Sequence, residues 1–321
     1  KPRLTVAARV KGGGNLQTGI GLEDLLDYNW KIALGNELFD LKEFEDLVQN
    51  GRKVVRLKDG FLTLDPEEIR RLLEGTRRSP GPADAIAAYL EGATAFDAQA
   101  RTAFDNLFRE KEISLPRGLR AELRSYQVNG FCWAWNNLMN GFGCLLADDM
   151  GLGKTVQAIA LIQKLKEEDR LNEGALVVVP ASLMTNWRRE LQRFAPELRV
   201  HDYYGPKRAV VQDQDVYLST YETVLRDVEK LSDCRFSLLL LDEAHILKNA
   251  ATKRAKSVRV IPSTGRLALS GTPVENRLED LRAIMDLVFP GYLGDPASFR
   301  TAWRIPIELH RDEERAAALR R

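Results

Sequence analysis

From about residue 115 to the end of the chain, short apolar runs alternate with segments of helical periodicity. The apolar runs predict five strands, at residues 144–147, 176–179, 216–219, 238–241 and 267–269. Between them, apolar residues recur at helical spacing over 155–167, 183–194 and 252–258. Such alternation is typical of βαβ units, so the pattern predicts a mostly parallel sheet with flanking helices. Right-handed crossovers would bring the loops that follow the strands to one edge of this sheet.

The first 114 residues have a different pattern, which predicts a small α+β domain without a chemical motif. Residues 38–48 have helical spacing, with Asp40 as a candidate N-cap. Asp59-Gly60 separates two short apolar runs and predicts a β-hairpin, because Asp-Gly suits a tight turn. Further helices are expected at 65–75, 83–90 and 95–108, with a charged linker at 77–82. We therefore divide the chain into domains at 1–114 and 115–321.

The composition is that of an ordinary globular protein. A chain of 321 residues with 44% hydrophobic and 29% charged residues can form a sizeable core. The formal net charge is +1, so any binding of nucleic acid must come from local patches. Cys132, Cys144 and Cys234 lack the spacing of zinc ligands and favour a reducing compartment. We find neither a signal peptide nor an apolar run near the roughly 20 residues that span a bilayer.

Two segments together predict a site that hydrolyses a nucleoside triphosphate. In residues 151–155, Gly-Leu-Gly-Lys-Thr, a glycine turn offers backbone N–H groups to phosphates. Lys154 would reach the β- and γ-phosphates, and the Thr155 hydroxyl is a candidate Mg²⁺ ligand. Further along, four leucines lead into Asp242-Glu243. An apolar strand that ends in two acids supplies one carboxylate that supports Mg²⁺ and one that positions the attacking water.

Each segment alone also has a purely structural explanation. A generic phosphate loop has glycine five residues before Gly153, where this chain has Asp148. Four leucines before Asp242 fit any buried parallel strand. The two segments in this order, each at the end of an expected strand, favour the nucleotide site.

The chain resembles the first RecA-like lobe of Swi/Snf-related ATPases, which belong to the superfamily-two helicase-like translocases. The resemblance covers 115–321 and implies an α/β fold, a RecA-like parallel sheet with flanking helices. It also explains Asp148, because the Met-Gly-Leu-Gly-Lys-Thr form of the loop is typical of this family. The segments that carry it are LRSYQVNG (123–130), ADDMGLGKT (147–155), VVPASL (178–183) with Asn186-Trp187, STYE (219–222), DEAHILKN (242–249) and LSGTP (269–273).

The resemblance implies roles in binding and hydrolysing ATP with Mg²⁺. Lys154, Asp242 and Glu243 are the expected catalytic residues, with Glu243 as the base that activates water. Thr155 and Asp242 are the expected metal-binding residues. Gln127 would read adenine, because its amide offers both a donor and an acceptor. The full expected nucleotide-binding set is Gln127, Asp149, Met150, Gly151, Leu152, Gly153, Lys154, Thr155 and Val156.

Three further residues are expected to couple the nucleotide to motion, namely His245, Ser270 and Thr272. The family often has threonine at the position of Ser270, and serine keeps the hydroxyl. The implied partner is double-stranded DNA, gripped by its phosphates with little sequence specificity. The matching positions are Asn186, Thr220, Lys248 and Arg266. A basic cluster follows at Lys253, Arg254, Lys256 and Arg259, for which a solvated surface is the alternative explanation.

The N-terminal region is similar, more loosely, to a domain that precedes the motor in some bacterial members of the family, through residues 25–30 and 64–68. This implies a cytoplasmic bacterial protein associated with the nucleoid, without a membrane partner. The N-terminal domain is expected to be a packing or regulatory scaffold that contacts other protein subunits.

A motor of this class needs a second RecA-like lobe that contributes arginines. No segment after Pro273 repeats a nucleotide-binding pattern, so we expect that lobe to be absent from this chain and the isolated chain to turn ATP over weakly. Two other functions stay open. Asp-Glu-Ala-His also marks a group of RNA helicases, although Met150-Gly151-Leu152 and Asn186-Trp187 argue against it. The chain could also be a nucleotide-binding or partner-binding module without turnover.

Overall fold

The computed structural model describes residues 3–10, 26–34, 37–49, 54–57, 60–63, 69–70, 73, 76, 79–80, 85, 88–89, 96–108, 113–206, 208–271, 277–290, 293, 296–313 and 315–316. The chain divides into two compact units, Lys1–Arg109 with Ala316–Arg321, and Glu110–Arg315. Some predicted features lie outside the described residues. These are the hairpin turn at 58–59, the helix start at 65–68, most of the linker at 77–82, and Thr272.

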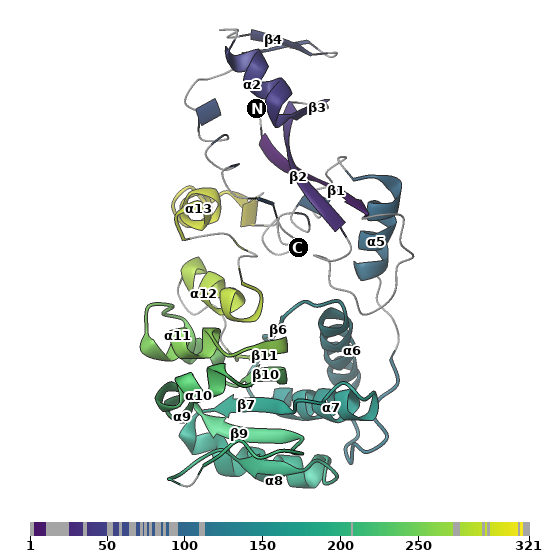
Figure 1. Ribbon diagram of the computed structural model, residues 1–321, viewed down its shortest axis with the longest axis vertical. Helices are drawn as coiled ribbons and strands as arrows, with labels where there is room; N and C mark the ends of the chain where they lie inside the picture. The colour runs from purple at the N-terminus through teal and green to yellow at the C-terminus, as the bar shows by residue number, and fades with distance from the viewer. Residues whose placement is uncertain are drawn as a thin grey trace. The chain divides into compact units, whose positions relative to one another are not determined.

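The first unit contains a three-stranded antiparallel sheet in the order β1-β2-β3 (Figure 1). Its strands are β1 (Arg3–Val10), β2 (Leu26–Leu34) and β3 (Glu37–Asp40). The predicted hairpin is confirmed as β4 (Val54–Leu57) and β5 (Gly60–Thr63). The helices are α2 (Leu41–Gln49) and α5 (Ala98–Phe108). Strands β1 and β2 were not expected, because alanine, aspartate and asparagine within them favour other conformations.

The helix predicted over 38–48 begins later than expected. Residues Glu37–Asp40 pair with β2, so the helix begins at Leu41. Asp40 directly precedes it, and the Asp40 N–H donates to the Glu43 carboxylate at 3.0 Å. This is one half of a capping box. Phe44 of α2 then packs against Ile32 and Leu34 of β2 in a buried hydrophobic cluster of this unit.

The second unit is built on a six-stranded sheet in the order β6-β11-β10-β7-β9-β8, and every pairing within it is parallel. The strands are β6 (Cys144–Leu146), β7 (Ala175–Val179), β8 (Val200–Asp202), β9 (Val216–Thr220), β10 (Phe236–Leu241) and β11 (Ser263–Leu269). The five predicted strands are confirmed. The sixth, β8, has a single apolar residue in its three positions, so it left no apolar run in the sequence.

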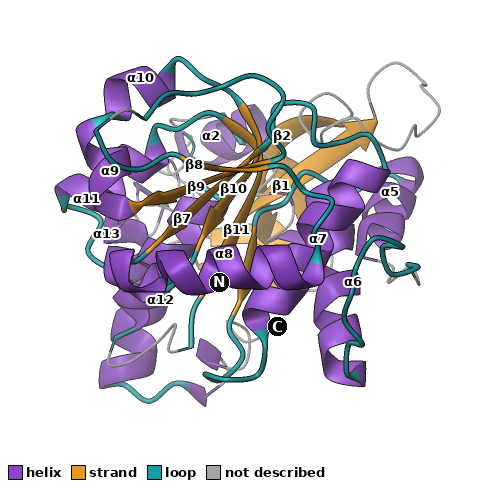
Figure 2. Ribbon diagram, turned by 90° about the horizontal axis from the view of Figure 1, so that it is seen from below, coloured by secondary structure: helices purple, strands orange, loops and turns teal. Residues whose placement is uncertain are grey.

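Both faces of this sheet are covered by helices. One face carries α6 (Ser125–Met139), α7 (Lys154–Glu167) and α8 (Met184–Phe194). The other carries α9 (Tyr221–Arg226), α10 (Val228–Ser232), α11 (Lys253–Arg259) and α12 (Leu278–Val288). In Figure 2, α9, α10 and α11 lie on one side of the strands and α6 and α7 on the other. Shorter segments are the 3₁₀ turns Ala181–Leu183 and Ala244–Leu247, α13 (Pro296–Phe299) and a π-helix over Arg300–Leu309.

Side chains of the central strands alternate between the two cores. Leu238 and Leu240 of β10 belong to the core beneath α6, α7 and α8, whereas Leu239 and Leu241 belong to the core on the opposite face. All four are fully buried. A strand buried on both faces reads as a continuous apolar run, which explains the four leucines.

The strands of the second unit end at a common level. Leu146 of β6 is level with Leu269 of β11, and Leu241 of β10 is level with Val178 of β7. The ladder extends one residue further on two strands. The Ser270 N–H donates to the carbonyl of Leu146 at 3.0 Å, and the Asp242 N–H donates to that of Val178 at 2.9 Å. The segments after β6, β7, β10 and β11 therefore leave one edge of the sheet.

A buried carboxylate anchors the start of β9. Asp215 is 5% exposed and accepts hydrogen bonds from the Lys166 ammonium at 2.8 Å and the Arg199 backbone N–H at 2.7 Å. The Arg199 guanidinium adds two more at 3.3 Å. Burial acts to raise the pKa of this carboxyl, but the hydrogen bonds from Arg199 and Lys166 together outweigh it, so the pKa lies below its usual value. This network joins α7 to the strand.

We expect Asp215→Asn to lower the free energy of unfolding by about 1–3 kcal/mol at pH 7, because two cations lose their carboxylate. The lost free energy is not larger, because the side chains of Lys166 and Arg199 are partly exposed and water screens their charges. Since the folded pKa is depressed, this stabilisation is present above the usual carboxyl pKa and is lost as the pH falls below it. Urea unfolding at pH 7 and pH 3 measures both effects. Asp213→Asn, at an exposed position, is the control, and equal loss in the two variants would contradict the assignment.

Candidate functional site

The loop between β6 and α7 has a backbone that favours glycine at two positions. Gly151 has φ +82° and Gly153 has φ +78°. A Cβ added at Gly151 would meet no atom within 4 Å, so this glycine is needed for its conformation and not for space. Gly153 is the N-cap of the 14-residue helix α7 and offers no capping side chain. The first N–H groups of α7 are thus left to a ligand, which suits an anion.

Lys154 is the first residue of α7 and folds back over this loop. Its ammonium group donates to the backbone carbonyls of Asp148 at 2.5 Å and Asp149 at 2.9 Å. An ammonium group has three donors, so a third remains for an anionic ligand in this arrangement. Thr155 and Val156 follow within the first turn of α7. The structure therefore brings the predicted phosphate-binding residues together.

Gln127 of α6 connects that helix to the loop. Its side-chain oxygen accepts the Arg124 N–H at 2.9 Å, and its amide NH₂ donates to the carbonyl of Leu152 at 3.0 Å. A Cβ added at Gly153 would lie 2.4 Å from this amide nitrogen and would displace it from the Leu152 carbonyl. The Tyr126 hydroxyl donates to the same carbonyl at 3.2 Å. Whether Gln127 also reads adenine stays a prediction.

Asp242 lies directly after β10 and is 7% exposed. One carboxylate oxygen, Oδ2, accepts the indole N–H of Trp187 at 2.7 Å, and the other accepts the Glu243 N–H at 2.9 Å. The Tyr221 hydroxyl donates to the Asp242 backbone carbonyl at 2.6 Å. Burial raises the pKa of Asp242 above its usual value, and the two N–H donors oppose it. The charge of Lys154 also opposes it, so the two halves of the site are within electrostatic reach.

Glu243 has a strained backbone, with φ 51° and ψ 49°. A non-glycine residue in this left-handed region costs about 1–3 kcal/mol, and such strain is concentrated at functional sites. Its Oε2 lies 3.1 Å from Nδ1 of His245, but the two are not aligned as a hydrogen bond. Among the described residues, both atoms and Oγ of Ser270 are buried without a hydrogen-bond partner. Three unpartnered polar atoms near one sheet edge are suited to a polar ligand.

These residues fit a nucleotide with Mg²⁺. In the described part of the chain, no group of three or more His, Cys, Asp and Glu is arranged to hold a metal ion. Mg²⁺ usually takes one or two protein oxygens and completes its shell with substrate phosphates and water. The Thr155 hydroxyl and the Asp242 carboxylate would supply such oxygens, and the glycine loop would supply the phosphate cradle.

The loop also packs against the segment after β11. Met150 is 71% exposed, and a Cβ added at Gly271 would lie 2.4 Å from its Cγ. Ser270 precedes that glycine and is fully buried. Two of the three residues predicted to couple nucleotide to motion, His245 and Ser270, thus lie at the same edge as the loop.

The four predicted DNA contacts lie in different surroundings. Asn186 is exposed on α8, where its amide donates to Glu190 at 3.0 Å. Lys248 is half-buried and follows the 3₁₀ turn Ala244–Leu247. Thr220 is 1% exposed, and its hydroxyl caps α9 by accepting the Thr223 N–H at 3.2 Å. A contact between the Thr220 side chain and a DNA phosphate was expected, but this side chain is buried and caps a helix instead.

Arg266 differs from the expectation as well. Its guanidinium donates to Oγ of Ser263 at 3.2 Å and to the backbone carbonyls of Leu287, Arg259 and Ile261 at 2.8–3.1 Å. Burial and the nearby charge of Arg259 lower its pKa. Arg266 therefore ties β11 to α12, and we assign it a structural role.

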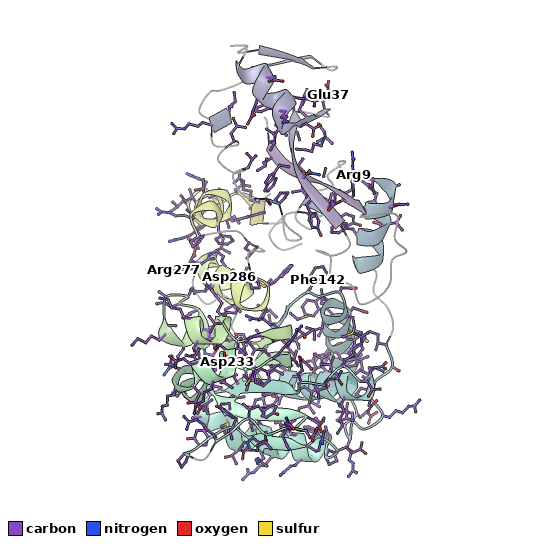
Figure 3. All side chains as sticks on the ribbon, viewed as in Figure 1. Arg9, Glu37, Phe142, Asp233, Arg277 and Asp286 are labelled. Carbon is purple, nitrogen blue, oxygen red and sulfur yellow. The ribbon has the colours of Figure 1, made fainter. Side chains whose placement is uncertain are left out.

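The basic cluster on α11 is partly neutralised. Arg254 pairs with Glu222 of α9 at 2.6 Å, and Arg259 pairs with Asp286 of α12, also at 2.6 Å. Figure 3 labels Asp286 on α12. These pairs join neighbouring helices on one face of the sheet, which supports the alternative explanation for two of the four cations.

Sequence reasoning missed two residues of the site, Trp187 and Tyr221. Both donate hydrogen bonds to Asp242 across the sheet edge. Both lie in segments that carried the family resemblance, each directly after a residue chosen as a DNA contact. Nothing in the spacing of residues indicates where an aromatic side chain points, so these two residues could not be selected from the sequence.

Comparison with known proteins shows the family. Residues 126–321 match the SNF2-related domain, and residues 1–91 match a family described as SNF2 Helicase protein. The chain belongs to the SNF2-related family, and the expected fold class, a RecA-like parallel sheet with flanking helices, is confirmed. No helix in the described part is long and apolar enough to cross a membrane.

Individual relatives are longer than this chain. It is 34% identical, over 98% of its length, to the putative ATP-dependent helicase/translocase YwqA of Bacillus subtilis, of which it spans 38%. It is 36% identical over 64% of its length to the TATA-binding protein-associated factor mot1 of Schizosaccharomyces pombe, of which it spans 12%. The SWI2/SNF2 ATPase core of Sulfolobus solfataricus in complex with dsDNA matches with a TM-score of 0.60 and 38% identity, covering 65% of this chain and 45% of that one.

We expect Gly153→Ala to weaken ATP binding by about 10-fold or more, because its Cβ displaces the Gln127 amide and strains the loop. Gly141→Ala is the matched control, since Gly141 has φ +81° and a Cβ there meets nothing within 4 Å. Both variants have a similar conformational cost. Titration with a fluorescent ATP analogue measures the binding. Equal affinity in the two variants would show that the contact between Gly153 and Gln127 does not shape the site.

Proposed function

We propose that this chain is the ATP-binding lobe of an ATP-driven translocase that tracks along double-stranded DNA. The observation that supports it best is the meeting of Lys154, Asp242 and Glu243 at one sheet edge. Among the described residues, three buried polar atoms at this edge also lack a hydrogen-bond partner. Membership of the SNF2-related family supports the same reaction class.

In this proposal the chain binds ATP through the glycine loop and hydrolyses it. Lys154 and the N–H groups of α7 would hold the phosphates, and Thr155 and Asp242 would hold Mg²⁺, which neutralises phosphate charge when it is bound. The remaining carboxylate, Glu243, would orient water and accept its proton. His245 lies 3.1 Å from Glu243 and would sense its state.

The DNA partner is proposed from Asn186 and Lys248, whose segments follow β7 and β10. The Sulfolobus solfataricus relative was solved with dsDNA, which supports a duplex. Contacts to phosphates carry no base sequence, so little sequence preference is expected.

The complete protein would contain a second RecA-like lobe, since the relatives are much longer than this chain. We also propose that residues 1–114 form a separate regulatory or partner-binding domain, and that the protein acts at the bacterial nucleoid.

We expect Glu243→Gln to keep ATP binding and to lower turnover by about 10²-fold or more, because an amide fills the same space but takes no proton. Equilibrium binding and steady-state hydrolysis, measured side by side in the complete protein, separate the two effects. Glu229→Gln, an exposed position on α10, is the control. Loss of binding together with turnover would mean that Glu243 is needed to build the site and is not its base.

We expect the isolated 321-residue chain to bind ATP but to hydrolyse it slowly, with or without duplex DNA. It supplies Lys154, Thr155, Asp242 and Glu243, but the arginine that stabilises the transition state is expected from the second lobe. In other phosphoryl-transfer enzymes such an arginine raises the rate by about 10³–10⁵. Steady-state hydrolysis of the isolated chain, compared with the complete protein, tests this. Equal DNA-stimulated rates would show that one lobe forms a complete site.

A further inference from the structure

Two buried aromatic residues hold Asp242 from two different strand ends. Trp187 of α8, which follows β7, donates its indole N–H to Oδ2 at 2.7 Å. Tyr221, the first residue of α9 after β9, donates its hydroxyl to the backbone carbonyl at 2.6 Å. Both side chains are 1% exposed. Asp242 is therefore fixed at its carboxylate by one neighbour and at its backbone by another.

The Asp242 carboxylate accepts two hydrogen bonds, and only the one from Trp187 comes from a distant part of the chain. The Glu243 N–H that reaches Oδ1 belongs to the next residue in the chain, so it moves with Asp242. Trp187 lies 55 positions away in sequence and packs in the core beneath α7 and α8. An indole has a single N–H donor, and in Trp187 this donor binds Oδ2 of Asp242. The rotation of the carboxylate is consequently tied to the position of α8.

The same helix reaches the surface one residue earlier. Asn186 is exposed and lies directly before Trp187, near the start of α8. A helix moves as a nearly rigid element, so a shift of its first turn moves Asn186 and Trp187 together. A ligand that pulls on this turn would also turn the Asp242 carboxylate.

We propose that Trp187 is a positioning residue that orients Asp242 for Mg²⁺ and transmits the binding of duplex DNA at α8 to the metal site. The second half of this inference rests on the proposed function, whereas the first half does not. Residues that hold a metal-binding group in place typically change metal affinity by about 10–100-fold when they are lost.

The test uses Trp187→Phe in the complete protein, which removes the N–H and keeps most of the ring. Trp135→Phe is the matched control. Trp135 lies on α6, is 8% exposed in the same core, and is not among the hydrogen-bond partners of Asp242. The first readout is binding of a fluorescent ADP analogue during titration with Mg²⁺. The second is the ratio of ATP hydrolysis with duplex DNA to hydrolysis without it.

For Trp187→Phe we expect unchanged binding of the analogue without Mg²⁺, about a 10-fold rise in the Mg²⁺ concentration for half-maximal effect, and a reduced DNA-stimulation ratio. The Trp135→Phe control should match the wild type in both readouts. If Trp187→Phe also matches the wild type in both, the inference is overturned. A loss of binding without Mg²⁺ that equals the loss with it would likewise overturn it, because that pattern indicates general damage to the site.

Tyr221→Phe is the second variant, for the case that Trp187→Phe does not fold. It removes the Tyr221 hydroxyl that donates to the Asp242 backbone carbonyl and leaves the ring, so we expect a smaller shift of the Mg²⁺ requirement in the same direction. No shift in a folded Tyr221→Phe would overturn the inference. A wild-type protein that hydrolyses ATP without DNA stimulation would instead contradict the proposed function, and the Mg²⁺ titration would still decide whether Trp187 positions Asp242.

Discussion

The site depends on the register of the parallel strands in the second unit. Because Leu146 is level with Leu269 and Leu241 with Val178, the segments that follow these strands leave the sheet side by side. The hydrogen bonds from Ser270 to Leu146 and from Asp242 to Val178 extend this register into the site itself. A shift of one residue in any of these strands would exchange its two faces and move the polar residues away from the edge.

The same edge concentrates features that lower stability. Asp242 is a buried carboxylate with a raised pKa, Glu243 has a left-handed backbone, and among the described residues three buried polar atoms there lack a hydrogen-bond partner. Such features cost free energy in a folded protein unless a ligand compensates for them. The large hydrophobic cores on both faces of the sheet supply the stability that allows this. The structure is therefore preorganised for a charged ligand at the carboxyl ends of its strands.

Much of the second unit could be predicted from its sequence, because strands buried on both faces leave apolar runs and a nucleotide loop needs glycine. The phosphate loop, Lys154 and Asp242-Glu243 follow from those rules. The short edge strand β8 and the Ser-Thr-Gly-Arg start of β11 left no such run. The surroundings of Arg266 and Thr220 were also out of reach, since a sequence does not show whether a polar side chain faces solvent or closes a helix end. For the same reason the sequence did not reveal that Trp187 and Tyr221 bind Asp242.

We propose that Lys154 and the Asp242-Glu243 pair form the ATP site of a motor driven along duplex DNA, and one assay can test this proposal. Its most direct test is steady-state ATP hydrolysis by the complete protein, alone, with duplex DNA and with RNA, for the wild type and for Lys154→Ala. We expect stimulation by duplex DNA, less stimulation by RNA, and no turnover in Lys154→Ala, because the phosphates lose their cation. Turnover that survives Lys154→Ala, or stimulation by RNA in place of DNA, would contradict it.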